Sequence, residues 1–121
     1  MQYLRSFWNA ARELDPAAER WDHASRAEIC RPDPLRHALE SAGLQGVLVH
    51  NIDIITSFYG FDDYWAPFLG GQGRAPSYCV QLSDARRAEL HARLEQSLPR
   101  DPEGEIALVA RAWAVWGVVP E

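Results

Sequence analysis

The chain has no lysine, and this absence excludes several kinds of chemistry. All 12 basic residues are arginine, so a Schiff-base lysine and the lysine of a phosphate-binding loop are excluded. With 17 acidic residues the formal charge is −5. Affinity for nucleic acid comes mainly from basic side chains that release counterions. We therefore expect no nucleic-acid partner.

Cysteine is scarce, and no apolar run is long enough to cross a membrane. Cys30 and Cys79 allow one disulfide at most and match no structural zinc pattern. The N-terminal residues lack the uninterrupted apolar segment of a signal peptide. The stretch 106–119 is broken by Arg111 and Gly117 and is shorter than the roughly 20 residues of a membrane span. We expect a cytoplasmic protein without a metal site or membrane contact.

Three segments have the periodicity or the end signals of helices. With 47% hydrophobic residues, the 121 residues suffice for a single domain, 1–121, with a core. Residues 2–14 carry apolar side chains at helical spacing, and the Asp-Pro step that follows predicts the end of that helix. We predict a second helix over 34–42, with Asp33 as its N-cap and Gly43 after its end. A third helix is predicted over 84–98, with Ser83 as its cap.

Two segments are predicted to be strands. Residues 46–57 are rich in Val, Ile and Thr and follow the second helix directly, which predicts a helix-strand unit. Residues 105–116 are apolar on both faces apart from Arg111, which predicts a strand covered on both sides. The fold class is therefore α/β, or α+β if the chain is taken by itself.

The segment 58–79 combines aromatic residues with glycine and proline. Helical spacing from Phe61 to Leu69, where Pro67 would remove one interior hydrogen bond, predicts a short or kinked helix followed by a glycine-rich loop. That loop, 70–73, does not stand between a strand and a helix, so we interpret it as a turn rather than a phosphate site. Asp62 and Asp63 suit the positive end of a short helix.

The residue types that most often carry catalysis are scattered. No two histidines have the H-x3-H spacing of a metal pair, and we interpret most of them as surface or satisfied core residues. The aromatic side chains are a stronger candidate, because aromatic walls are typical of small-molecule pockets, although the same periodicity is typical of an ordinary core. The four histidines are His23, His37, His50 and His91.

Four stretches resemble a known family. They are SFWNAARELDPAAE, CRPDPLRHALESAGL, FDDYWAPFLGGQGRAPSYCVQL and IALVARAWAVWG. They are similar to the C-terminal part of class I S-adenosylmethionine-dependent methyltransferases, in the bacterial branch of the ubiquinone/menaquinone C-methyltransferases. The resemblance spans essentially the whole chain, and its most specific part is the aromatic FDDYWAPFLGG segment.

The resemblance implies a Rossmann-like sheet of seven strands, in which 46–57 and 105–116 are the last two and pair antiparallel. It implies that 2–14 and 58–79 belong to a lid over the methyl acceptor. The acceptor-binding candidates are then Trp8, Tyr64, Trp65 and Phe68. The resemblance assigns no catalytic base.

The resemblance also places the cofactor site outside this sequence. In the family, the strand, glycine loop and helix that bind S-adenosylmethionine lie in the N-terminal half, and these 121 residues hold no counterpart. We therefore expect a truncated or split methyltransferase (a transferase), inactive alone and unable to bind the cofactor tightly.

The resemblance also has a consequence for partners, because in the family's sheet 105–116 would lie between the strand 46–57 and a fifth strand that this sequence lacks. The absence of that fifth strand would leave an exposed edge on 105–116, which predicts a homodimer or higher homo-oligomer, or pairing with a separate cofactor-binding half. Two alternatives stay open, namely a non-enzymatic oligomer that binds an aromatic small molecule and a structural remnant.

Overall fold

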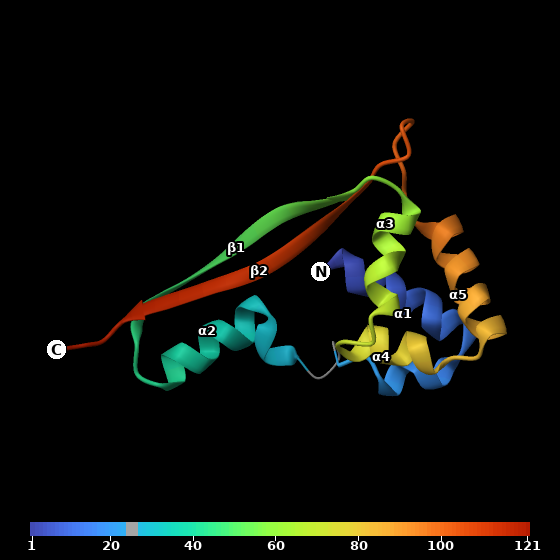
Figure 1. The fold of residues 1–121 in the computed structure, drawn as a ribbon. Helices are drawn as coiled ribbons and strands as arrows, with labels where there is room; N and C mark the ends of the chain where they lie inside the picture. Colours follow the sequence, from blue (N-terminus) through green and yellow to red (C-terminus); the bar gives the residue numbers. More distant parts are fainter. Residues whose placement is uncertain (24–26) are drawn as a thin grey trace. The chain divides into compact units, whose positions relative to one another are not determined.

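The computed structural model describes residues 1–23 and 27–121. Within them the chain is mixed α/β, with five α-helices and one antiparallel sheet of two strands (Figure 1). It divides into two compact units. Unit 1 contains Met1–Asp22 and Ile55–Ala110, and unit 2 contains His23–Ile54 and Arg111–Glu121. Both strands contribute residues to each unit.

Unit 1 begins with helix α1, Gln2–Leu14, which confirms the prediction for this segment. The helix ends at Asp15, whose backbone is extended, as expected for the residue before a proline. The Asp15 carboxylate accepts a hydrogen bond from the backbone N–H of Ala17 at 3.0 Å and so caps the 3₁₀ turn Pro16–Arg20. The apolar side of α1 buries Phe7, with Trp8 beside it.

The aromatic segment of unit 1 forms helix α3, Phe61–Trp65, and a 3₁₀ turn, Ala66–Leu69. The α-helix ends before Pro67, which confirms the prediction of a short helix. Helix α4, Arg74–Gln81, was not predicted, because the glycines and prolines of 58–79, Pro76 among them, indicated a loop. A proline in the first turn of a helix removes no intrahelical hydrogen bond, so α4 tolerates it.

Helix α5, Asp84–Ser97, closes the core of unit 1. The Ser83 hydroxyl accepts a hydrogen bond from the Arg86 N–H at 3.3 Å, which confirms the predicted cap. Leu90 and Leu94 are buried, and α1 packs against α5 and α4. The residues of the main buried cluster all belong to unit 1; they are Phe7, Trp8, Ala10, Ala11, Ala18, Phe61, Tyr64, Trp65, Phe68, Ala75, Tyr78, Cys79, Leu90, Leu94, Leu98, Ile106 and Leu108.

Unit 2 contains helix α2, Pro32–Ser41, and the prediction that Asp33 caps it was wrong. The helix begins at Pro32, two residues earlier than predicted, so Asp33 lies in its first turn, where a carboxylate favours the positive end of the helix dipole. The predicted C-terminal signal is confirmed: Gly43 has φ +94°, and its N–H bonds the Glu40 carbonyl at 3.0 Å. The Leu44 N–H bonds the Leu39 carbonyl at 3.1 Å, which completes a Schellman motif.

The two predicted strands are confirmed as β1, Gln45–Phe58, and β2, Ile106–Val118, and they pair with each other (Figure 1). The prediction that the second strand is covered on both sides was wrong. Ile106 and Leu108 are buried, whereas no residue from Arg111 to Val118 is. A sheet of two strands gives each strand one neighbour, and α2 buries none of its own side chains. The apolar sequence of β2 therefore exceeds what the described residues cover.

In residues 1–23 and 27–121, no helix combines the length and the apolar character needed to cross a bilayer.

Candidate functional site

Aromatic side chains from five elements of unit 1 meet in one cluster. The closest ring pair is Phe7 and Phe68, stacked with centroids 4.4 Å apart. Tyr3 stacks on Phe68 at 4.8 Å and on Phe58 at 5.6 Å. We call this set the aromatic cluster; it consists of Tyr3, Phe7, Trp8, Phe58, Phe61, Tyr64, Trp65, Phe68 and Tyr78.

The four residues expected to bind the acceptor all belong to the aromatic cluster. Tyr64 and Trp65 lie 5.4 Å and 5.9 Å from Phe68 between ring centroids. The Trp8 ring meets the Phe7 ring at 5.1 Å and the Tyr78 ring at 5.5 Å. None is more than 7% exposed. Each therefore packs as a core residue, and a ligand can reach these rings only if neighbouring side chains move.

One buried hydrogen bond links α1 to α3 inside the cluster. The Tyr64 hydroxyl donates to the backbone carbonyl of Tyr3 at 2.9 Å. Burial raises the pKa of Tyr64 well above its ordinary range and raises the pKa of Tyr3 to about 12. Both phenols are therefore neutral at physiological pH. They can donate a hydrogen bond but do not act as bases.

His91 of α5 contacts the aromatic cluster. Its ring meets Phe61 at 4.8 Å and Trp65 at 5.2 Å, in both cases nearly at right angles. The imidazole Nδ1 lies 3.8 Å from the Glu95 carboxylate, and the side chain is 36% exposed. The prediction of a surface position thus holds for only part of the side chain. Its position one residue after the buried Leu90 turns it toward α3 rather than away from the core.

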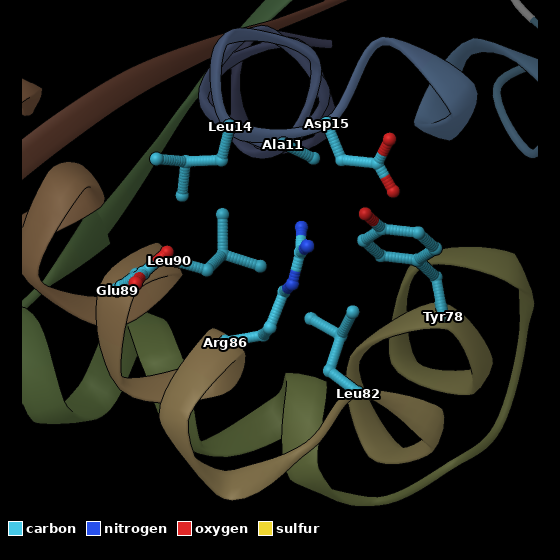
Figure 2. A pocket seen from close by; sticks show the side chains of 8 residues that line it. All are labelled: Ala11, Leu14, Asp15, Tyr78, Leu82, Arg86, Glu89 and Leu90. Atoms are coloured by element: carbon cyan, nitrogen blue, oxygen red, sulfur yellow. The ribbon is translucent and has the colours of Figure 1, made fainter.

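A small pocket lies beside the cluster, between α1, α4 and α5. Figure 2 shows the Arg86 side chain extending into its middle, while the Tyr78 hydroxyl points toward the Asp15 carboxylate. The remaining space for a water-sized sphere is about 10 Å³, roughly the room that one water requires. Burial is the main reason that the pKa of Tyr78 is raised, and the charge of Asp15 adds to it. This pocket is too small for an organic ligand.

His37 and His50 have partners outside the aromatic cluster, whereas Cys79 is buried in the same core as the cluster. His37 hydrogen-bonds Ser41 at 3.3 Å on α2, and His50 stacks on Trp116 at 5.1 Å in the sheet. Both cysteines are free thiols; burial raises the pKa of Cys79, which disfavours the reactive thiolate. Within the described ranges, no three His, Cys, Asp or Glu side chains gather as a metal site.

Sequence reasoning missed part of the cluster and its exposed border. Tyr3, Phe58 and Tyr78 belong to the cluster although they stand in three distant parts of the sequence. Their only signal is apolar character within a periodic segment. Tyr59 is 93% exposed, directly after β1, and its N–H donates to the Asp63 carboxylate at 3.1 Å. The exposed Tyr59 ring is therefore more accessible to a ligand than the buried rings of the cluster.

Compared with models of protein families, with curated proteins and with solved structures, the chain matches none of them.

Proposed function

We propose that this chain forms the acceptor-binding side of a class I S-adenosylmethionine-dependent methyltransferase with a Rossmann-like fold. The sequence resemblance to the bacterial ubiquinone/menaquinone C-methyltransferases suggests it. The antiparallel pairing of β1 with β2 is the observation that carries it, since the resemblance implies this pairing for the last two strands. The unit formed by α2, Gly43 and β1 supports the same assignment.

The described residues do not fit the cofactor itself. The loop Gly70–Gly73 follows a 3₁₀ turn and precedes α4, whereas a dinucleotide-type site needs a glycine loop between a strand and a helix. We therefore assign S-adenosylmethionine to a cofactor-binding part outside these residues, either in the same polypeptide or in a separate cytoplasmic chain.

The role left to this chain is to bind the acceptor and exclude water. The aromatic cluster supplies apolar rings for a planar small molecule, and Tyr64 holds α3 against α1 through its bond to Tyr3. Because Trp8, Tyr64, Trp65 and Phe68 are buried, acceptor entry requires α3 to shift from the core. The segment around α3 thus acts as a lid.

The DNA directly upstream of codon 1 provides the first test. The proposal predicts that it encodes a strand, a glycine-rich loop and a helix, in frame or in an adjacent gene. An unrelated sequence there would contradict the assignment to a methyltransferase.

A binding experiment then tests the acceptor site. Menadione, a planar naphthoquinone, should quench tryptophan fluorescence in the wild-type chain. Replacing Trp65 by Leu should weaken this binding about tenfold, because one aromatic wall is lost. Replacing the exposed Trp116 of unit 2 by Leu is the control and should leave the affinity unchanged. Equal effects of the two replacements would contradict acceptor binding at the cluster.

The aromatic cluster also supports a second candidate, a non-enzymatic module that binds an aromatic small molecule. The two functions differ in their need for a cofactor-binding part. If menadione raises the melting temperature while the upstream DNA encodes no such part, the binding module is the better account.

A further inference from the structure

The outer edges of the two-stranded sheet can be read from two hydrogen bonds. Arg36 Nη1 donates to the Val47 carbonyl of β1 at 2.7 Å, and the Val109 N–H of β2 donates to Gln2 Oε1 at 2.6 Å. Both backbone groups are thus bonded by side chains from outside the sheet. The N–H and C=O of one residue point to the same side of a strand, and the side alternates along the chain. The odd-numbered residues of both strands therefore present their backbone groups outward.

Asp53 of β1 and Arg111 of β2 face each other across the sheet, in agreement with this register. Arg111 Nε and Nη2 donate to the two Asp53 carboxylate oxygens at 2.6 Å and 2.8 Å. Both residues have odd numbers, so in this register they form a pair that exchanges no backbone hydrogen bonds. Side chains approach most closely at such pairs.

The two edges differ in how they are protected against further pairing. Natural edge strands avoid association through charges, prolines or covering side chains. On β1 the outward positions include Asn51 and Asp53, and Arg36 covers the Val47 carbonyl. Beyond Arg111, β2 continues as AWAVWGV, without a charge or a proline. Trp116 and Val118 in this stretch are 47% and 65% exposed.

We propose that a second copy of this chain pairs antiparallel with β2 along residues 111–117. The pairing is centred on Ala114 and sets Arg111 across from Gly117 of the second copy. The two Arg111 side chains then lie six residues apart along the ladder, roughly 20 Å, so no like charges face each other. A two-stranded sheet is marginal alone, and this pairing extends it to four strands.

This inference rests on the proposed function in one respect, because the cofactor-binding part would adjoin the same edge. The second copy occupies the edge when the chain is alone. The test therefore uses the purified chain without cofactor, so that its failure leaves the methyltransferase proposal untouched.

The test replaces Val115 by Pro, which removes an outward N–H and no hydrogen bond between β1 and β2. The matched control is Val49→Pro at an outward position of β1; both valines are partly buried. Light scattering at tens of micromolar should give twice 13.7 kDa for the wild type and the control, and 13.7 kDa for Val115→Pro. Two symmetry-related hydrogen bonds are lost, so the dimer should dissociate about 100-fold more readily.

A second pair of variants covers the case in which proline unfolds the chain. Val115→Arg places two like charges near the two-fold axis and should give a monomer with an unchanged circular dichroism spectrum, whereas Val49→Arg should remain a dimer. A monomeric wild type would overturn the proposal. So would a folded Val115 variant that still dimerises, or dissociation caused by the Val49 variants alone.

Discussion

Unit 1 and unit 2 are similar in their share of apolar sequence but differ in what those residues bury. In unit 1 the rings of Phe7, Tyr64 and Phe68 are fully buried. In unit 2 the one buried hydrophobic residue among those described is Val47, while Ile52 and Ile54 are more than half exposed. Unit 1 is therefore stabilised by its own core, and unit 2 has the composition of a core without the layers that would cover it.

This difference explains which sequence predictions held. Local signals fix local structure: the Asp-Pro step ends α1, Ser83 caps α5, and Gly43 ends α2. Whether a strand is covered depends instead on the elements that pack around it, and among the described residues β2 has one neighbouring strand. The apolar pattern of β2 therefore predicted the strand correctly but not its burial.

The largest expected contrast comes from truncating one apolar side chain in each unit. Phe68→Ala removes a fully buried ring that stacks on Phe7 and Tyr3 and should cost about 3–5 kcal/mol of unfolding free energy. Ile54→Ala, at a side chain 61% exposed, should cost less than about 1 kcal/mol. Urea denaturation of both variants, at a protein concentration that keeps the chain monomeric, measures the two unfolding free energies. Similar losses would show that unit 2 has a core of its own.

Two glycine replacements test whether unit 2 depends on the turn at the end of α2. Gly43 has φ +94°, so Gly43→Ala forces a left-handed alanine and should cost about 1–2 kcal/mol. Gly60 has an extended backbone with open space at the Cβ position, so Gly60→Ala should be nearly neutral. Thermal unfolding followed by circular dichroism measures both. A smaller loss for Gly43→Ala than for Gly60→Ala would exclude the Schellman motif as the end of α2.

Alkali should act first on unit 1. The pKa of Tyr3 is raised to about 12, and that of Tyr64 is raised further, above an unfolded value near 10. Unfolding allows these phenols to ionise, so the stability they contribute is complete below pH 10 and declines as the pH rises toward 12. The phenolate absorbance of these residues should rise over the same pH range in which circular dichroism shows unfolding. Tyr64→Phe should shift the alkaline transition upward, and an unchanged transition would contradict burial as its cause.

Acid should have a smaller effect, in unit 2. The hydrogen bonds from Arg111 lower the pKa of Asp53 below its ordinary value of about 3.9. A lowered carboxyl pKa contributes stability that is present above pH 4 and is lost as the pH falls through the lowered value. The carboxyl carbon of Asp53, followed by NMR, should titrate at higher pH in Arg111→Gln. If its titration stays in place, the pair does not form in solution.

The candidate site was predictable in part. The four rings expected at the acceptor site all belong to the aromatic cluster, with Trp8 on α1, Tyr64 and Trp65 on α3, and Phe68 in the 3₁₀ turn. Tyr3 contacts Phe68, and Tyr78 contacts Phe7, only through packing between segments 65 and 71 residues apart, which no local pattern encodes. The helix α4 that carries Tyr78 was not predicted, because the glycines and prolines of 58–79 indicated a loop, and a proline in a first turn looks like a proline in a loop.

We propose that this chain provides the acceptor side of a methyltransferase and not its cofactor site. Calorimetric titration of S-adenosylhomocysteine is the decisive measurement, first into the purified chain and then into the chain combined with the proposed cofactor-binding part. We expect no heat from the chain alone and saturable binding in the combination. Micromolar binding by the chain alone, or no binding in the combination, would contradict it.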